Sequence, residues 1–360
     1  MGHRMFNQFH PVHRVALGAL ALALILAQAV EPGNREVRPD AMAAERDGIV
    51  FKSRRSLMGT EFKVTIWAPP DKSGIAAQAL GEVFDELAGL EKRISSWQAD
   101  SETTRVNASA GQSAVPIGVE LEDLLNRSLH WARKTGGAFD VSGGPLFALW
   151  EEARERGTLP SQEEIDACRA LIGYQHIRMT DGRVRLQKAG MELGFGAIGK
   201  GFAADRAAAF LESKGLSNYI IDAGGDLLVK GRRGDRSWHV GVRHPRGEEF
   251  LARLEGGDCA IATSGDYERY FIVDGQRYSH ILDLRSGLPA KRLTSVTVIA
   301  SSTADADALA TALFVMDASR GLELVEEQPE VDAIFVDDNG KITLSTGLHL
   351  QGDRLRLDRP

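Results

Sequence analysis

Short stretches of alternating apolar and polar residues along the chain predict strands. The stretch "EFKVTIWAP" at 61–69 alternates with a period of two. Three further stretches, "IRMTDGRVRLQ", "RYFIVDGQRYSHILDL" and "AIFVDDNGKITLS", each place a D-G or N-G pair between strand-like runs. Such pairs favour tight hairpin turns. We therefore expect sheets that are largely antiparallel.

Other stretches have the spacing of helices. Apolar residues recur at helical intervals in "IAAQALGEVFDELAGLEKRI" (75–94) and in "EDLLNRSLHWARKTGG" (122–137), which ends in two glycines that suit a helix C-terminus. A further helix is expected in "FAADRAAAFLESKG" (202–215). Strands and helices mix without a regular βαβ rhythm. The fold class predicted is therefore α+β, with mixed, largely antiparallel sheets and helices.

The N-terminal segment has the pattern of a secretory signal. Arg4 and Arg14 precede an apolar run that ends in an A-x-A cleavage site at Ala29. The run is shorter than the roughly 20 apolar residues that span a bilayer, so we favour a cleaved signal at 1–29 over an uncleaved anchor. Residues 30–48 are predicted to be a polar linker, and residues 49–355 the folded domain. The mature protein is expected in the periplasm, with anchoring to the inner membrane as the alternative.

The charge of the chain disfavours a nucleic-acid partner. The formal net charge is -7, and removal of Arg4 and Arg14 with the signal makes it -7 - 2 = -9. Two cysteines, Cys168 and Cys259, are far apart in the sequence. They could pair in an oxidising compartment or remain separate buried thiols, and their spacing does not decide between the two.

The glycine-rich stretch "LGFGAIGKGFAADRA" at 193–207 fits two nucleotide-binding patterns. It contains G-x-G-x-x-G, but the preceding "KAGMELG" is poorly apolar for a parallel strand, and the hairpins do not suit a doubly wound fold. It also reads G-x-x-x-x-G-K from Gly194 to Lys200, yet Gly201 stands where an ATPase loop needs a hydroxyl. Either the glycines only permit close packing, or their backbone approaches a phosphate beside Lys200.

A second candidate lies in the helical stretch "STADADALATALFVM". Ser302 and Asp305 form an S-x-x-D capping box, so Asp305 has a structural explanation. Asp307 and Thr311 are spaced i and i+4, which places two hard oxygen ligands on one face, as Mg²⁺ prefers. The alternative is an Asp that complements the helix dipole and a Thr bonded to its own helix.

Eight ordered motifs carry a family resemblance. The glycine-rich stretch and the Asp307 helix occur together with "MGTEF", "SSWQADSETTRVN", "GGAFDVSGGPLFALW", "IDAGGDL", "ATSGDYERYF" and "SHILDLRSGLP". In this order they closely resemble the ApbE family of FAD:protein FMN transferases, over roughly residues 55–317. The resemblance implies a T-fold-related α+β architecture, FAD as substrate, Mg²⁺, and transfer of FMN to a Thr or Ser of an exported client, such as a redox-pump subunit or an electron-transfer protein. The alternatives are an FAD pyrophosphatase that gives FMN and AMP, and a periplasmic flavin-binding protein without chemistry.

The resemblance also implies roles for individual residues. The metal ligands would be Asp307, Thr311 and the carbonyl of Ala197. The FAD contacts would be Met58, Trp97, Ala138, Phe139, Asp140, Gly194, Lys200 and Ile281. For proton transfer we choose His280, because a neutral imidazole can accept the proton of an attacking hydroxyl near pH 7. The alternative for His280 is a structural histidine, hydrogen-bonded at a strand end.

The chain departs from the family pattern at three positions. Trp97 stands where Tyr is usual; without the resemblance, it would be assigned to the core or an interface. Gly194 stands where many members have Asp, and Glu192 is a candidate to replace that carboxylate. Ala310 stands where some members have an acid before the metal-binding Thr. We therefore expect weaker metal binding than is usual in the family.

Overall fold

The computed structural model describes residues 41–45, 47–273 and 275–357. The predicted signal at 1–29 and most of the predicted linker lie outside these residues. The strands are β1 (Ala41–Glu45), β2 (Gly48–Leu57), β3 (Thr60–Ala68), β4 (Val115–Pro116), β5 (Ile177–Thr180), β6 (Arg183–Leu186), β7 (Tyr219–Ala223), β8 (Asp226–Lys230), β9 (His239–Arg243), β10 (Phe250–Glu255), β11 (Cys259–Gly265), β12 (Tyr270–Val273), β13 (Gln276–Ser279), β14 (Leu282–Asp283), β15 (Leu288–Pro289), β16 (Leu293–Ala300), β17 (Asp332–Asp337), β18 (Ile342–Leu344), β19 (Leu348–Gln351) and β20 (Arg354–Leu357). The α-helices are α2 (Ser73–Ile94), α3 (Glu102–Ala108), α4 (Val119–Lys134), α5 (Gly144–Arg156), α6 (Gln162–Arg169), α7 (Gly199–Ser213), α8 (Thr303–Val315) and α9 (Ala318–Glu326), and two short 3₁₀ turns are η1 (Pro70–Lys72) and η2 (Tyr174–His176).

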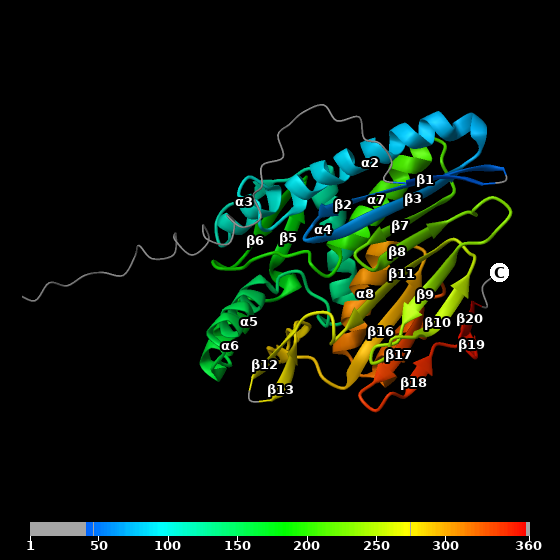
Figure 1. Cartoon of the computed structure of the whole chain (residues 1–360). Coiled ribbons are helices and arrows are strands. Elements are labelled where there is room, and N and C mark those ends of the chain that lie inside the picture. Colours follow the sequence, from blue (N-terminus) through cyan, green and yellow to red (C-terminus); the bar gives the residue numbers. More distant parts are fainter. Residues whose placement is uncertain (1–40, 46, 274, 358–360) are drawn as a thin grey trace, which may run out of the picture. The chain divides into compact units, whose positions relative to one another are not determined.

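One large antiparallel sheet organises the described part of the chain (Figure 1). Its strand order is β1-β2-β3-β7-β8-β11-β16-β17-β18, and every neighbouring pair is antiparallel. Strand β16 is buried along its whole length, as expected for a central strand that is covered on both faces.

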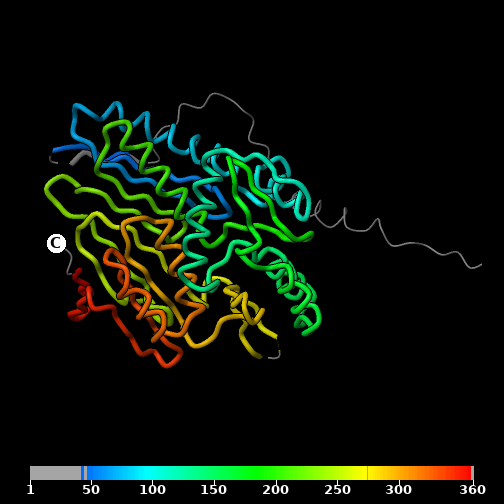
Figure 2. Tube along the Cα trace, turned by 180° about the vertical axis from the view of Figure 1, so that it is seen from behind, coloured from blue at the N-terminus to red at the C-terminus, as the bar shows by residue number. Residues whose placement is uncertain are grey.

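Helices cover one face of this sheet (Figures 1 and 2). The main hydrophobic core joins apolar side chains of α2, α4, α7 and α8 to those of β3, β7 and β16. Phe84 of α2 and Phe202 of α7 are among its largest fully buried side chains. Burial of a side chain of this size stabilises the fold by about 1.5–3 kcal/mol.

A smaller sheet of order β19-β20-β10-β9 contributes to a second core. This core joins its side chains to Val229 of β8, Ile261 of β11 and Ile299 of β16 on the main sheet. Cys259 belongs to this second core, whereas Cys168 packs beside a third cluster that includes Trp150. The two cysteines are not bonded to each other, which answers the question that their spacing left open.

Helices α7 and α8 approach each other closely at one point. A Cβ atom on Gly201 of α7 would lie 2.2 Å from the carbonyl oxygen of Thr303, the first residue of α8. The Asp205 carboxylate of α7 also accepts hydrogen bonds from Ser302 Oγ (2.8 Å) and from the backbone N–H groups of Thr303 (2.8 Å) and Ala304 (3.0 Å). Asp205 therefore caps the N-terminus of α8 and, with Gly201, holds it beside the first two turns of α7.

Most elements expected from the sequence are confirmed. The 61–69 strand is β3, the first two helices are α2 and α4, and the three hairpins are β5–β6, β12–β13 and β17–β18. The α+β class with largely antiparallel sheets is confirmed as well; β10 and β20 pair in parallel.

Two details differ from the expectations. Residues 41–45, within the predicted linker, form the edge strand β1 by pairing with β2, because backbone pairing does not require apolar periodicity. The Asp305 side chain does not complete a capping box with Ser302 but accepts a hydrogen bond from Trp131 Nε1 at 2.6 Å, while Ser302 Oγ accepts from the Asp305 N–H as expected.

Among the described residues, none of the helices is both long and apolar enough to cross a membrane.

Candidate active site

Lys200 lies between two buried carboxylates in the first turn of α7. Its Nζ is 3.1 Å from Oδ2 of Asp226 and 3.1 Å from Oδ2 of Asp307. It also donates to the carbonyl of Gly196 in the glycine loop at 3.4 Å. The backbone N–H of Gly201 donates to Asp307 Oδ2 at 3.2 Å. Asp307 thus binds both the lysine and the N-terminal turn of α7, where the helix dipole favours negative charge.

Further oxygen atoms lie around this pair of carboxylates. Thr311 follows Asp307 by one helical turn, and its hydroxyl is 3.3 Å from Ser264 Oγ in β11. Asp226, at the start of β8, accepts a backbone hydrogen bond from Thr263, the neighbour of Ser264. We call Asp226, Ser264, Asp307 and Thr311 the oxygen cluster. Thr311 bonds across to β11, so the alternative of a bond to its own helix does not describe it.

With both of its carboxylates ionised, the oxygen cluster carries more negative charge than Lys200 neutralises. Asp226 and Asp307 are each 4% exposed. Burial, followed by the charge of Asp307, raises the pKa of Asp226 despite the opposing effect of Lys200. Burial alone would lower the pKa of Lys200, but the two carboxylates raise it overall, so the ammonium stays charged. When both carboxylates are ionised, one cation between them leaves a net charge of about -1 in a site of low dielectric constant, and the raised pKa of Asp226 reflects the cost of that charge.

These residues fit a divalent cation. Oδ2 of Asp226 is buried without the geometry of a hydrogen bond, although Lys200 lies nearby. Carboxylate, hydroxyl and carbonyl oxygens are the ligands that Mg²⁺ prefers. Within the described ranges, no group of three or more His, Cys, Asp or Glu side chains could hold a metal. A Mg²⁺ site here would therefore need neutral oxygens and substrate phosphate besides the carboxylates.

The glycines of the loop before α7 fall into two groups. Only open space surrounds the position of a Cβ on Gly194 or Gly196, and neither has a left-handed φ. Gly201, in contrast, is required by the close approach of α7 to α8. The packing explanation of this glycine-rich stretch therefore holds for Gly201. Gly196 is exposed, as a phosphate-binding loop requires, whereas the Gly194 N–H already donates to the Val141 carbonyl at 2.8 Å.

His280 lies at the end of β13. Its Nδ1 is 2.9 Å from the carbonyl oxygen of Arg269. Although the residue is exposed, enough protein surrounds the ring to lower its pKa by loss of hydration. The hydrogen bond to the Arg269 carbonyl opposes this shift, and the charges of Arg269 and Lys200 add to it. The imidazole is therefore neutral at pH 7, as a base must be. The hydrogen bond of His280 at a strand end is compatible with both expected roles, proton acceptor and structural histidine.

Two expected FAD contacts lie near the C-terminal end of α2. Met58 has a left-handed φ of 51° in the β2–β3 turn, and its N–H donates to Glu91 Oε1 of α2 at 2.9 Å. Trp97 follows α2, and its N–H donates to Ser95 Oγ at 3.1 Å. The Trp97 side chain is 94% exposed. The core assignment of Trp97 is therefore wrong, whereas its role as a platform for an aromatic ring stays a prediction.

Trp97→Ala is expected to weaken FAD binding by about 1–3 kcal/mol, the range for one base stacked on an aromatic side chain. Because the indole is exposed in the absence of ligand, the substitution should leave the melting temperature of the unliganded protein unchanged. Fluorescence titration with FAD, together with thermal unfolding, measures both quantities. Equal FAD affinity in the variant and the wild type would contradict the stacking role.

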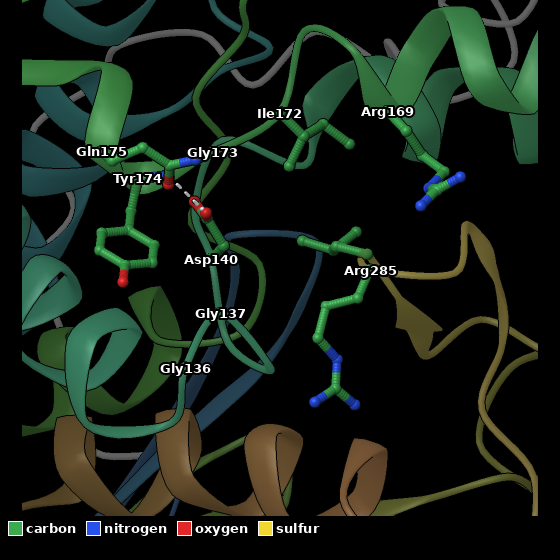
Figure 3. A pocket seen from close by; sticks show the side chains of 10 residues that line it. Gly136, Gly137, Asp140, Arg169, Ile172, Gly173, Tyr174, Gln175 and Arg285 are labelled. Atoms are coloured by element: carbon green, nitrogen blue, oxygen red, sulfur yellow. Dashed lines mark hydrogen bonds between the residues drawn. The ribbon is translucent and has the colours of Figure 1, made fainter.

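Asp140 follows Ala138 and Phe139 in the chain and lines a cavity of about 260 Å³ whose lining includes no residue of the oxygen cluster (Figure 3). Ala138 and Phe139 are buried. The Asp140 carboxylate accepts hydrogen bonds from the N–H (2.9 Å) and Oγ (2.7 Å) of Ser142 and from the N–H of Tyr174 (2.6 Å). Burial nevertheless raises the pKa of Asp140. Asp140 thus joins two loops, and its free acceptor capacity for FAD is small.

The expected site residues are only partly brought together. Lys200, Asp307 and Thr311 meet at the oxygen cluster, with the loop that contains Ala197 and Gly194 beside them. The Ile281 carbonyl accepts from Ala290 N at 2.8 Å. No hydrogen bond or ion pair among the described residues joins Met58, Trp97 or Asp140 to the oxygen cluster.

Glu192 and Ala310, which relate to the departures from the family pattern, make no hydrogen bond to the oxygen cluster among the described residues. Glu192 is exposed, and its backbone carbonyl accepts from Gly144 at the start of α5 at 3.3 Å. No hydrogen bond of the described residues connects it with the oxygen cluster, so replacement of a carboxylate at Gly194 by Glu192 has no support in this geometry. Ala310 is buried in the main core.

Sequence reasoning did not single out Asp226 and Ser264. Both stand in motifs that support the family resemblance, "IDAGGDL" and "ATSGDYERYF". The available signal for Asp226 was a carboxylate directly after a Gly-Gly turn at the start of an apolar strand. The signal for Ser264 was weaker, because a hydroxyl near a strand end is common.

Comparisons with known proteins agree with the resemblance. The ApbE family model matches residues 58–335. The FAD:protein FMN transferase of Treponema pallidum is 34% identical over 320 residues, which cover 84% of this chain and 87% of the relative. That of Vibrio cholerae is 33% identical over 295 residues, covering 79% and 87%.

Solved structures agree in fold. An ApbE protein of Thermotoga maritima has a TM-score of 0.76 at 32% identity and covers 82% of this chain and 97% of its own. The apo form of the Pseudomonas stutzeri flavinyl transferase ApbE has a TM-score of 0.76 at 33% identity, covering 84% and 97%. Family match, sequence identity and fold together show that this chain belongs to the ApbE family.

Proposed function

We propose that this chain transfers FMN from FAD to a Thr or Ser hydroxyl of an exported client protein, with Mg²⁺ required and AMP released. Its curated relatives are named FAD:protein FMN transferases, and on this basis the chain is a flavin transferase with FAD and a protein acceptor as substrates. The finer parts of the proposal, which are the metal, the acceptor hydroxyl and the leaving group, rest on the site itself.

The observation that carries the proposal is the position of the oxygen cluster. Lys200 lies between two buried carboxylates in the first turn of a helix, next to a glycine loop with open space at Gly194 and Gly196. The Thr311 hydroxyl follows Asp307 by one helical turn and contacts Ser264. Helix N-termini and accessible glycine backbone bind phosphate groups. A diphosphate that bridges two organic groups, as in FAD, suits such a site.

The residues of the chain divide the work of the reaction. Lys200 and the loop N–H groups hold the diphosphate, and Asp307, Thr311 and the Ala197 carbonyl would hold Mg²⁺, which when bound neutralises charge on the diphosphate oxygens. The client hydroxyl oxygen forms a bond to the FMN-side phosphorus, and His280 accepts its proton. The bond from that phosphorus to the bridging oxygen breaks, and AMP leaves with this oxygen.

The pH dependence of transfer tests His280. A base must be neutral, so activity falls as the pH drops through its pKa. The pKa of His280 is lowered, and the loss is therefore expected below the ordinary value of about 6.5. Arg269→Ala removes a positive charge beside the ring, which should raise this pKa and move the loss of activity to higher pH. The control is Arg277→Ala, because the Arg277 guanidinium lies over the Tyr270 ring. Superimposable profiles for Arg269→Ala and the wild type would argue against His280 as the base.

One incubation tests the function as a whole. Purified protein is mixed with FAD and Mg²⁺, with and without a candidate client, and AMP release is followed together with covalent flavin fluorescence of the client. Transfer predicts both products only when the client is present. AMP without a client would indicate an FAD pyrophosphatase, and neither product would leave a flavin-binding protein.

Export is part of the same proposal, because the client is an exported protein. The motivation is the signal pattern at 1–29, where an A-x-A site precedes Val30. Mass spectrometry of the protein recovered from the periplasm should find an N-terminus near Val30. An intact N-terminus would favour an anchored protein instead.

A further inference from the structure

The hydrogen bond of His280 defines which ring nitrogen carries the proton. A carbonyl oxygen can only accept, so the 2.9 Å contact between Nδ1 and the Arg269 carbonyl requires a hydrogen on Nδ1. The same carbonyl accepts from the backbone N–H of His280 at 3.1 Å. Within the described residues, no hydrogen bond to Nε2 is found. In the neutral ring, Nε2 therefore carries the lone pair.

The hairpin before His280 holds the Arg269 carbonyl in place. Strands β12 and β13 pair Tyr270 with Ser279, and the His280 N–H···O bond continues this register by one pair. A two-stranded hairpin is only marginally stable alone. Here the cross-strand pair Phe271 and Tyr278 stacks with ring centroids 5.4 Å apart.

Trp150 of α5 contacts the chain on both sides of His280. Its ring centroid lies 5.9 Å from that of Phe271 and 6.1 Å from that of Tyr278, in the hairpin that precedes His280. Its Nε1–H donates to the carbonyl of Gly287 at 2.9 Å, in the β14–β15 turn that follows His280. Trp150 is 6% exposed. A buried, hydrogen-bonded indole is a rigid support.

We propose that Trp150 and the β12–β13 hairpin are positioning elements that hold His280 as the Nδ1–H tautomer, so that Nε2 is the atom that accepts the proton of the client hydroxyl. The role of Nε2 rests on the proposed function, whereas the tautomer does not depend on it. The Arg269 backbone carbonyl acts here as the orienting group that a carboxylate or carbonyl supplies to other catalytic histidines.

The tautomer can be read directly. In ¹⁵N-histidine-labelled protein at a pH above the pKa, long-range ¹H–¹⁵N spectra distinguish protonated from unprotonated ring nitrogens, and the spectrum of His280→Gln identifies the His280 signals. His244 is an internal control, because its Nδ1 accepts from the Arg246 N–H at 3.1 Å and it should therefore be the Nε2–H tautomer. We expect opposite patterns for the two residues. The same pattern for both, with Nε2 of His280 protonated, would overturn the proposal.

The positioning role is tested with Trp150→Phe. This variant keeps an aromatic ring against the hairpin but lacks the donor to Gly287. We expect a mixture of His280 tautomers and a turnover number lowered about tenfold, with the KM for FAD unchanged. This loss is smaller than the roughly 10²–10⁴-fold that a well-placed base contributes, because His280 itself is retained. The control is Tyr278→Phe, which keeps the stacked ring and loses an exposed hydroxyl.

The variants separate the role of Trp150 from that of the Arg269 backbone carbonyl. A folded Trp150→Phe with the wild-type tautomer and turnover would refute the role of Trp150. Arg269→Ala keeps the carbonyl and should keep the tautomer, so a changed tautomer in that variant would refute the role of the backbone. If Trp150→Phe does not fold, the wild-type spectrum decides the tautomer. That spectrum needs neither FAD nor client, so a failure of FMN transfer would leave it unaffected.

Discussion

Asp307→Asn should lower the rate of FMN transfer by about 10²-fold or more, the usual loss when one strong electrostatic group is removed from an active site. The substitution deletes a negative, hard metal ligand and keeps the shape of the side chain, so the amide oxygen of the Asn can take the place of Oδ2 as acceptor for the Gly201 N–H. A weakened site can be refilled by mass action. Higher Mg²⁺ concentrations should therefore recover part of the rate, and Mn²⁺ should recover more, because it binds such ligands more strongly.

Two further variants of α8 complete this test. Thr311→Val should act in the same direction but less strongly, since it deletes a neutral ligand. Asp305→Asn is the matched control: Asp305 is an acid on the same helix that accepts from Trp131 Nε1, outside the oxygen cluster. Its Mg²⁺ dependence should equal that of the wild type. A Mg²⁺ titration in which the Asp307→Asn curve also coincides with the wild-type curve would remove α8 from the metal site.

Lys200→Met should destabilise the fold by about 3–5 kcal/mol, the usual result when one partner of a buried ion pair is removed. The variant leaves Asp226 and Asp307, each 4% exposed, without their cation. The expected cost comes from two buried carboxylates rather than from lost packing, because Met fills a similar volume. It should also abolish detectable transfer, since the charge beside the diphosphate is lost.

A double variant separates charge from packing. Lys200→Met combined with Asp226→Asn removes one carboxylate and should recover much of the lost stability, while transfer stays absent. Urea unfolding with EDTA present measures the free energies without a contribution from bound metal. Equal unfolding midpoints for Lys200→Met and the wild type would show that the two carboxylates do not depend on Lys200.

The strands, hairpins and long helices were predictable because each depends on local periodicity or local turn chemistry. Strand β3, helix α2 and the β17–β18 hairpin all lie where the pattern predicted them. The shared face of Asp307 and Thr311 was predictable for the same reason, because a helix fixes the direction of residues four positions apart.

The rest of the oxygen cluster depends on topology. Asp226 begins β8 and Ser264 lies in β11, and these strands meet α8 only because β8, β11 and β16 are neighbours in the sheet. No local pattern encodes that order. The necessity of Gly201 likewise arises from Thr303, a residue about a hundred positions later in the chain. The exposure of Trp97 could not be predicted from the sequence either, because an indole is found both in hydrophobic cores and at ligand-binding surfaces.

The contact between Gly201 and Thr303 has a consequence for ligand binding. At this point the backbones of α7 and α8 lie against each other, and the Asp205 carboxylate of α7 holds the first N–H groups of α8, so the helices cannot slide without breaking these hydrogen bonds. Lys200 and Asp307 are therefore preorganised before any nucleotide arrives, and little ordering entropy is lost at this end of the site. Any induced fit on FAD binding must come from segments outside this rigid pair, such as the exposed turn that carries Trp97.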